Sequence, residues 1–566
     1  MHSKTNTTLS TSFMQAILRN RTLLWVFFGL ALFNVFLNNH NTSLWDEDEA
    51  AYAGFAHVMR TTGNWVVPDF LWSEPHRKTP LHFWAIAGSY WLFGENEFAV
   101  RFPSALSVVL TCLTLYWLGR EVFGREVTLG AALLMACSIL LPNLGKISVT
   151  DALLTFFETV AALAIIRHYE RPSWRWAGLL WAAVALGVLV KGPPILILTF
   201  GMMGLLVLFH PKRWRFVSLH PWLGLPLALL PLWLWGRAAW LSDGGVYIRW
   251  MIDWYILKRA SGGVAFGQWG PPGYFLLVFF ISFLPWAVFF PKAIGRFFRR
   301  AVRWQPEPTY LYLGVWFVAG WFLYELIPSK LPSYAMGAYA GFALLLSQTI
   351  LDTESEGFVQ TTDLRVGQWL LLIFTLLIGV GLIVGASLLL DAWGIGMAVI
   401  TAVFWTGLGL VAWQAYRRGA LERGIKASAL QVLLFVFFAW LLIVPSFEQP
   451  RGATKRIAQS IASESTKDTE VVMARPFYPS LPFYLTQVPR HYRGLAHADF
   501  AQVFDLYARP QKTVLIFDAP KYQEFLDGLA ERQQVPPQHT RIISGWMADM
   551  GKLIDYTLVY NYPPAN

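Results

Sequence analysis

Long apolar segments recur along this 566-residue chain up to about residue 446, and this feature restricts the possible folds most strongly. Hydrophobic residues make up 55% of the chain and charged residues only 14%, and the mean hydropathy is +0.43. That composition leaves too little polar surface for a soluble globule of this length. The sequence therefore predicts a polytopic α-helical membrane protein.

Thirteen segments are predicted to cross the membrane, because each approaches the roughly 20 apolar residues that a bilayer core requires. They are residues 22–38, 102–119, 126–142, 149–166, 176–190, 194–209, 221–240, 272–291, 308–326, 332–349, 367–388, 394–414 and 427–446. Residues 80–94 form a shorter apolar stretch that contains His82. We expect an interfacial or re-entrant helix there.

The distribution of basic residues fixes the predicted orientation. With a cytoplasmic amino terminus, the six inner loops hold 18 Lys and Arg in 71 residues, whereas the outer loops hold 10 in 113. This bias agrees with the positive-inside rule. Because the basic residues are spread over short loops, the net charge of +10 is explained by topology and does not indicate nucleic-acid binding.

Two domains are predicted. Residues 1–446 form a transmembrane domain whose first outer loop, residues 39–101, carries juxtamembrane helices. Hydropathy falls after this region, and residues 447–566 are predicted to form an extracytoplasmic α/β domain. Helical patterns at 452–464, 498–508 and 520–533 alternate there with strand-like runs at 470–474, 513–517 and 555–560.

The predicted topology gathers ionisable residues on the outer face. Four consecutive carboxylates, Asp46 to Glu49, follow the first apolar segment, and a short helix is expected to begin near Asp48. Asp151 lies at the outer mouth of a membrane helix, where a buried carboxylate requires a cation such as Lys78 or Lys146. Other candidates on this face are Arg77, Lys191, Arg259, Lys330 and Tyr334.

Each of these residues also has an ordinary structural explanation. Acids near Asp48 complement a helix dipole, Asp151 can belong to a helix cap, and Lys191 and Lys330 can anchor at the headgroups. Their coincidence on one side favours a reaction centre. Transfer of a sugar from a lipid phosphate requires a base for the acceptor and cations for the departing phosphate.

The ordered set of motifs resembles the GT-C superfamily of polyprenyl-phosphate-dependent glycosyltransferases. The similarity is greatest to its bacterial 4-amino-4-deoxy-L-arabinose transferase and protein-mannosyltransferase-like branch, and it covers nearly the whole chain. The motifs are DEAAYA at 48–53, RKTPLHFW at 77–84, LFGENEFAVRFPSAL at 92–106, TDALLTFF at 150–157, KGP at 191–193 and SKLPSY at 329–334.

The resemblance implies an inverting transfer from an undecaprenyl-phosphate-type donor to a lipid, glycan or protein acceptor, at the periplasmic side of the inner membrane. Asp48 then matches the catalytic aspartate of the first loop, Lys78 the lysine for the donor phosphate, and Asp151 the acid of the second loop. Glu49 and Tyr52 match neighbours of the aspartate that contact substrate. The sequence does not decide whether Asp48 or Asp151 is the base.

The sequence departs from the family pattern at three places, which affects the expected metal site, sugar and acceptor. Ala51 stands where related arabinose transferases have an arginine, and the run from Arg77 to Pro80 replaces their Glu-Lys-Pro-Pro. Residues 241–271 contain no histidine, although family members bind a metal through a glutamate and a loop histidine. We therefore expect no equivalent metal site and no cofactor, while dependence on a divalent metal, the sugar and the acceptor stay open.

A different class of function remains as an alternative. A transporter or flippase of a charged polyprenyl lipid would use acids and lysines near membrane helices as a pathway. The sequence shows neither a repeated half nor a chain of charges through mid-membrane. A sensor whose tail binds a periplasmic partner is a third possibility, but it leaves the first-loop acids without a role.

Overall fold

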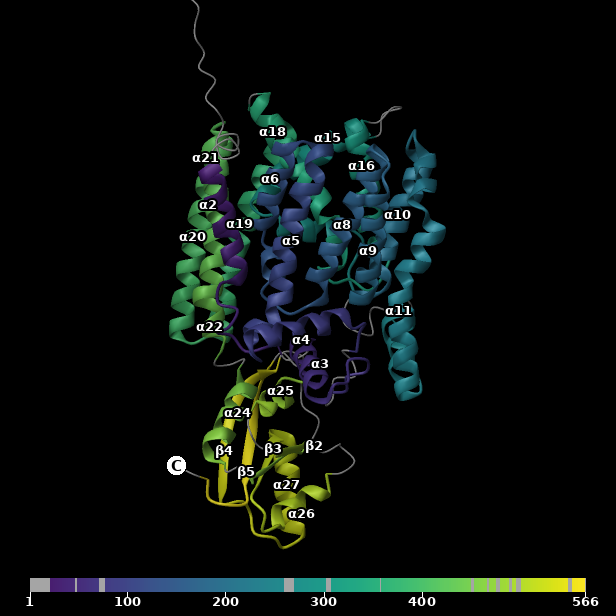
Figure 1. Cartoon of the computed structure of the whole chain (residues 1–566). Coiled ribbons are helices and arrows are strands. Elements are labelled where there is room, and N and C mark those ends of the chain that lie inside the picture. The colour runs from purple at the N-terminus through teal and green to yellow at the C-terminus, as the bar shows by residue number, and fades with distance from the viewer. Residues whose placement is uncertain are drawn as a thin grey trace, which may run out of the picture.

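The computed structural model describes residues 21–45, 48–70, 77–258, 269–301, 307–356, 358–448, 452–465, 468–474, 479–487, 491–494, 500–547 and 552–564. A bundle of helices forms one end of the molecule and a small mixed sheet forms the other (Figure 1). Two helices, α3 (Asp48–Thr62) and α4 (Leu81–Phe93), lie between them. The chain is therefore a polytopic helical protein with a separate C-terminal sheet region.

The bundle contains long helices, short helices and single-turn segments. They are α2 (Arg21–Phe36), α5 (Glu97–Phe123), α6 (Arg125–Ala136), α7 (Leu140–Leu144), α8 (Thr150–Glu170), α9 (Trp174–Lys191), α10 (Pro193–Phe209), η2 (Arg213–Leu219), α11 (Pro221–Asp243), α12 (Val246–Ile252), η3 (Asp253–Leu257), α14 (Tyr274–Ser282), η5 (Trp286–Phe289), α15 (Phe290–Ala301), α16 (Pro308–Phe317), η6 (Val318–Phe322), α17 (Leu323–Glu325), η7 (Tyr334–Ala338), α18 (Tyr339–Ser355), α19 (Thr362–Leu389), α20 (Ala392–Arg417), α21 (Leu421–Phe438), η8 (Ala439–Ile443) and α22 (Val444–Ser446).

Local sequence explains where several long helices begin. Asn96, Thr361 and Asp391 precede α5, α19 and α20, and each side chain accepts a hydrogen bond from a backbone N–H of the first turn. Such caps satisfy amide groups that have no partner within the helix. Gly124, with φ of 86°, provides the sharp turn between α5 and α6, a backbone conformation that favours glycine.

The predicted count of thirteen spans is not confirmed. Within the described residues, six helices are long and apolar enough to cross a membrane, and a seventh results if the bent pair η2 and α11 forms one span. Some predicted spans are interrupted: residues 272–291 divide into α14 and η5, and residues 308–326 contain the π-turn η6 between α16 and α17. The chain is a multi-pass membrane protein, and the number of crossings stays a prediction.

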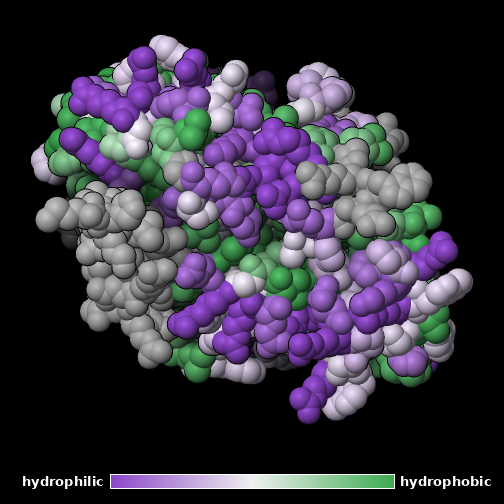
Figure 2. All heavy atoms as spheres, turned by 90° about the horizontal axis from the view of Figure 1, so that it is seen from above, coloured by the Kyte–Doolittle hydropathy of each residue, from purple (hydrophilic) through white to green (hydrophobic). Residues whose placement is uncertain are grey.

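The two ends of the bundle carry different segments. Helices α15 and α18 reach the end seen face-on in Figure 2, where hydrophilic side chains surround a smaller hydrophobic patch. The last turn of α15 carries Arg299 and Arg300. Helices α3 and α4, which belong to the predicted first outer loop, lie at the opposite end (Figure 1). Predicted inner and outer segments are thus found at different ends.

The C-terminal region is a five-stranded sheet with the order β2-β1-β3-β5-β4. Strand β1 pairs in parallel with β2 and β3, whereas β5 pairs antiparallel with β3 and β4. The elements are α24 (Ala453–Glu464), β1 (Glu470–Met473), α25 (Ser480–Thr486), β2 (His491–Gly494), α26 (Gln502–Ala508), β3 (Thr513–Asp518), α27 (Ala519–Glu531), β4 (His539–Met547) and β5 (Lys552–Tyr560). The three predicted helices and three predicted strands of this region are present, and α25, β2 and β4 were not predicted.

The C-terminal region and the helices α3 and α4 share one hydrophobic core. Tyr52 and Phe83 belong to the same cluster as Ile457, Leu481 and Tyr484, all of them buried. Burial of apolar surface between segments far apart in the sequence stabilises their relative position. The sheet region is therefore packed against the two helices that carry the predicted first-loop residues.

Candidate active site

Asp48, Tyr52 and Lys78 form one hydrogen-bonded group. Asp48 lies in the first turn of α3 and Tyr52 lies one turn later, so both side chains occupy the same helix face. The Tyr52 hydroxyl donates to Asp48 Oδ1 at 2.8 Å. Lys78 Nζ lies 3.4 Å from the same oxygen and also donates to the Tyr52 hydroxyl. Three residues predicted from the sequence to belong to the site are thus in contact.

Aromatic rings surround the Lys78 ammonium. Lys78 Nζ lies 4.7 Å from the centre of the Tyr52 ring and 5.6 Å from that of Tyr255, on η3. Burial, followed by the charge of Asp48, raises the pKa of Tyr52 well above its usual range. Tyr52 therefore remains a protonated donor. The Asp48 side chain is 45% exposed and that of Lys78 is 13% exposed, so the carboxylate is open to an incoming molecule.

The backbone around Lys78 is fixed by α12. The Tyr247 hydroxyl donates to the carbonyl oxygen of Lys78 at 2.9 Å. The guanidinium of Arg77 stacks over the Tyr247 ring at 5.4 Å and lies 3.4 Å from Asp69. Arg77 therefore lies beside the group and contacts Tyr247 and Asp69.

Asp151 pairs with Lys191, which corrects the sequence-based expectation that Lys78 or Lys146 would be its partner. Asp151 Oδ1 and Lys191 Nζ are 2.7 Å apart, at the start of α8 and the end of α9. The Lys191 ammonium also lies 4.9 Å from the centre of the Tyr334 ring. The expectation that Lys191 would only snorkel or bind phosphate missed this pair, because a contact between residues 40 positions apart depends on how the helices pack.

His82 is buried between Tyr52 and Ser148. Its Nε2 atom lies 3.1 Å from Ser148 Oγ, and its ring meets that of Tyr52 edge to face at 5.5 Å. Burial, followed by the charge of Lys78, lowers the pKa of His82 to about 3, while Asp151 and Asp48 act in the opposite direction. The imidazole is therefore neutral and lies among the charges of both groups.

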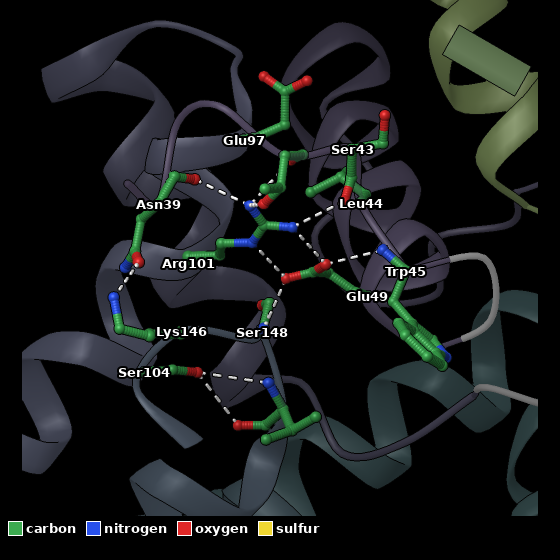
Figure 3. A network of polar contacts seen from close by, with 12 residues as sticks. Asn39, Ser43, Leu44, Trp45, Glu49, Glu97, Arg101, Ser104, Lys146 and Ser148 are labelled. Atoms are coloured by element: carbon green, nitrogen blue, oxygen red, sulfur yellow. Dashed lines mark hydrogen bonds and ion pairs between the residues drawn. The ribbon is translucent and has the colours of Figure 1, made fainter. Parts of the chain in front are cut away.

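Glu49 forms a buried structural contact with Arg101, and its predicted role in binding substrate stays a prediction. Its carboxylate is 2% exposed, and that of its partner Arg101 is 1% exposed. Arg101 donates to both Glu49 oxygens at 2.9 Å, and the backbone N–H groups of Trp45 and Ser148 donate to them at 2.8 Å (Figure 3). Four donors occupy the carboxylate and leave it little capacity to bind anything else.

Lys330 also forms a buried structural contact in this fold. Lys330 Nζ lies 2.7 Å from Glu325 and donates to the carbonyl oxygen of Pro271 at 3.3 Å. The lysine side chain is 2% exposed and contacts protein groups, and its predicted role as a headgroup anchor or phosphate ligand stays a prediction. The buried pair joins the segment before α14 to the turn after α17.

Lys146 is buried beside the same network as Glu49. It donates to the carbonyl oxygen of Leu37 and lies 4.7 Å from the centre of the Trp440 ring. Burial, followed by the charge of Arg101, lowers the pKa of Lys146 to about 7.

Asp46, Glu47 and Arg259 lie outside the described residues. Among the described ones, no group of three or more His, Cys, Asp or Glu side chains could hold a metal ion.

Sequence reasoning missed Arg101, Tyr247 and Tyr255. Arg101 had the clearest signal, because a lone arginine within the apolar run of α5 requires an acidic partner. Tyr247 and Tyr255 lie in an aromatic outer segment whose composition alone gives no indication of which ring faces Lys78. The missed residues mainly orient or enclose Asp48 and Lys78.

Comparisons with known proteins place these residues in a family context. Residues 77–235 match the model of the dolichyl-phosphate-mannose-protein mannosyltransferase family. Undecaprenyl phosphate-alpha-4-amino-4-deoxy-L-arabinose arabinosyl transferase of Edwardsiella ictaluri is 29% identical over 62% of this chain and 62% of its own length. The enzyme of that name from Yersinia pestis is 26% identical over 77% of this chain and 80% of its own length.

Several alignments cover only part of the relatives. The second arabinosyl transferase of Sodalis glossinidius is 30% identical, and the alignment spans 54% of this chain and 56% of that relative. The aligned part is thus less than two thirds of the length of the Edwardsiella and Sodalis proteins.

A solved structure supports the fold over nearly the whole chain. ArnT from Cupriavidus metallidurans, bound to undecaprenyl phosphate, superimposes with a TM-score of 0.74 at 19% identity and covers 96% of this chain and 98% of ArnT. Its apo form gives a TM-score of 0.72. The resemblance inferred from the sequence motifs is confirmed: the chain has an ArnT-like fold, and its sequence is similar to those of bacterial arabinosyl transferases and of the mannosyltransferase family.

Proposed function

We propose that this protein transfers 4-amino-4-deoxy-L-arabinose from undecaprenyl phosphate to lipid A at the periplasmic face of the inner membrane. The observation that carries the proposal is the contact between Asp48 and Lys78 at the end of the bundle that faces the C-terminal region. The fold shared with ArnT and the names of the relatives support the donor and the sugar. The reaction occurs outside the cytoplasm, and the chain crosses the membrane an odd number of times.

The reaction is a single displacement at the anomeric carbon. An oxygen of the acceptor forms the new bond to that carbon, and the bond to the donor phosphate breaks, with the electron pair leaving on the phosphate. The acceptor proton goes to a carboxylate. Inversion follows because the acceptor attacks opposite the leaving group.

Asp48 is the better base of the two candidate acids. Its carboxylate is 45% exposed, whereas that of Asp151 is 13% exposed and lies 2.7 Å from Lys191. A close ion pair stabilises the charged form of a carboxylate and weakens it as a base. In this proposal Asp48 takes the proton, while Asp151 and Lys191 form a second charged pair beside the site.

Lys78 binds the donor phosphate and stabilises the charge that develops on it. Its ammonium is largely enclosed and lies against two tyrosine rings. A preorganised cation in such surroundings costs little reorganisation during the reaction. Arg77 adds positive charge on the same segment.

Replacement of Lys78 by Met is expected to lower kcat/KM for the lipid-phosphate donor by about 10²-fold, the effect typical of removing one charge-stabilising donor. Initial rates of transfer at varied donor concentration measure it in the purified protein. Lys426→Met is the matched control, because Lys426 and Glu422 form an ion pair in which both side chains are half exposed. Equal kcat/KM values for Lys78→Met and wild type would remove Lys78 from the proposed site.

A further inference from the structure

The segment Thr42–Trp45, here called the strap, lies between α2 and α3 and is held at three consecutive backbone N–H groups. The N–H of Ser43 donates to Glu448 Oε2, that of Leu44 to the Tyr484 hydroxyl, and that of Trp45 to Glu49 Oε2, each at 2.8 Å. Three separate side chains thus fix the backbone that leads into α3.

Arg101 fixes the strap from the other side. Its guanidinium donates to the carbonyl oxygens of Thr42 and Ser43, each at 2.9 Å, while it binds Glu49 (Figure 3). Buried backbone groups with satisfied hydrogen bonds strongly restrict the local conformation. Because Asp48 begins α3 only three residues after Trp45, the strap determines where the Asp48 carboxylate lies.

Two of the three amide partners come from the far end of the chain. Glu448 follows the last helix of the bundle and Tyr484 lies on α25, about 400 and 440 positions from the strap. The Tyr484 hydroxyl also donates to Glu97 Oε1 at 3.2 Å, and Lys455 on α24 forms an ion pair with that oxygen. The C-terminal region therefore contacts both the strap and the first turn of α5.

The surroundings of Tyr484 maintain this hydrogen-bond pattern. The residue is 5% exposed and belongs to the core that also contains Ala50 and Tyr52 of α3. Burial, followed by the charge of Glu97, raises the pKa of Tyr484 well above its usual range. The phenol stays protonated, so it donates to Glu97 and accepts from Leu44 at the same time.

We propose that Tyr484 is a positioning residue for Asp48. Its hydroxyl accepts the hydrogen bond of the Leu44 N–H and so fixes the strap. In this way the C-terminal region holds the Asp48 carboxylate against Tyr52 and Lys78. The inference rests on the proposed role of Asp48 in transfer. Loss of the hydroxyl leaves the Leu44 N–H without its buried acceptor, and the strap shifts to find another one. A displacement of about 1 Å at a reacting group costs about 10²-fold in rate.

Tyr484→Phe tests the proposal in the full-length protein, with Tyr560→Phe as the matched control. Tyr560 is 2% exposed and donates to Glu464 at 2.6 Å, so each variant loses a buried bond from a phenol to a carboxylate in the same region. We expect Tyr484→Phe to lower kcat by at least about 10-fold, with donor KM within about 2-fold of wild type. Tyr560→Phe keeps the wild-type kcat, while both variants lose similar thermal stability.

A second variant tests the role of the strap independently if Tyr484→Phe does not fold. Glu448 lies outside the C-terminal sheet, and Glu448→Ala removes the acceptor of the Ser43 N–H. This variant is expected to lower kcat with the same small change in KM. The proposal is overturned if Tyr484→Phe and Glu448→Ala both retain wild-type kcat, or if Tyr560→Phe loses as much as Tyr484→Phe. Asp48→Asn, assayed in parallel, separates the two claims: full activity in that variant rejects the proposed role of Asp48 itself.

Discussion

Asp48→Asn is expected to reduce kcat for sugar transfer by about 10²–10⁴-fold, the usual contribution of a general base. The asparagine side chain keeps the size of the aspartate and can still accept the hydrogen bond of Tyr52, but it takes up no proton. Because Asp48 is 45% exposed, its replacement has little effect on the folded state. Initial rates with the purified protein and saturating donor measure the effect.

Asp253→Asn is the control for that experiment. Asp253 is an exposed acid on η3, close in sequence to Tyr255, and it pairs with Lys258 at 2.9 Å. We expect its replacement to leave kcat within about 2-fold of wild type, as is normal for an exposed polar residue away from the reacting atoms. Wild-type kcat in Asp48→Asn would reject Asp48 as the base, and Asp151→Asn would then identify whether the second acid has that role.

The largest effect on stability is expected from Arg101→Met. The change leaves the Glu49 carboxylate buried without its cation and removes the donors to the carbonyl oxygens of Thr42 and Ser43. Breaking one side of a buried ion pair typically costs about 3–5 kcal/mol. Thermal unfolding in detergent is expected to show a clear fall in Tm, with loss of activity because α3 is no longer held.

An exposed ion pair provides the comparison for Arg101→Met. Glu422 and Lys426 are half exposed and lie one turn apart on α21, and such helix pairs contribute only about 0.3–0.5 kcal/mol. Glu422→Gln is therefore expected to leave Tm nearly unchanged. Equal shifts in Tm for Arg101→Met and Glu422→Gln would show that the buried network is not what fixes the strap and α3.

The polytopic helical class and much of the C-terminal region were predictable, because both depend on local periodicity, whereas the count of thirteen spans stays a prediction. Strand β3, residues 513–518, is buried at every position and appears in the sequence as a continuous apolar run. Strand β4 lies at the sheet edge, and its mixture of polar and apolar residues carried no such signal. The break between α14 and η5 contains Pro285, a residue that cannot donate the backbone hydrogen bond of a continuing helix, whereas hydropathy gives no sign of the π-helical turn η6.

The sequence predicted which residues lie at the site better than it predicted which of them contact one another. Asp48, Tyr52 and Lys78 were named together, and their contact follows from helix spacing and one neighbouring loop. The contacts of Glu49 were not predicted, because adjacent helix positions point about 100° apart and the sequence does not reveal which of two consecutive acids faces inward. The partner of Asp151 depends on how α8 and α9 approach, so Lys191 was recognised as a cation but not as the partner.

The central claim is that the outer-face acids and lysines catalyse transfer instead of lining a path for lipid movement. The most direct measurement reconstitutes the purified protein in liposomes with undecaprenyl-phosphate aminoarabinose and lipid A, and follows both lipids by mass spectrometry. The proposed function predicts that lipid A gains the sugar while undecaprenyl phosphate is released, and that Asp48→Asn does neither. Movement of the intact donor between leaflets, with no sugar transferred to lipid A, would contradict it.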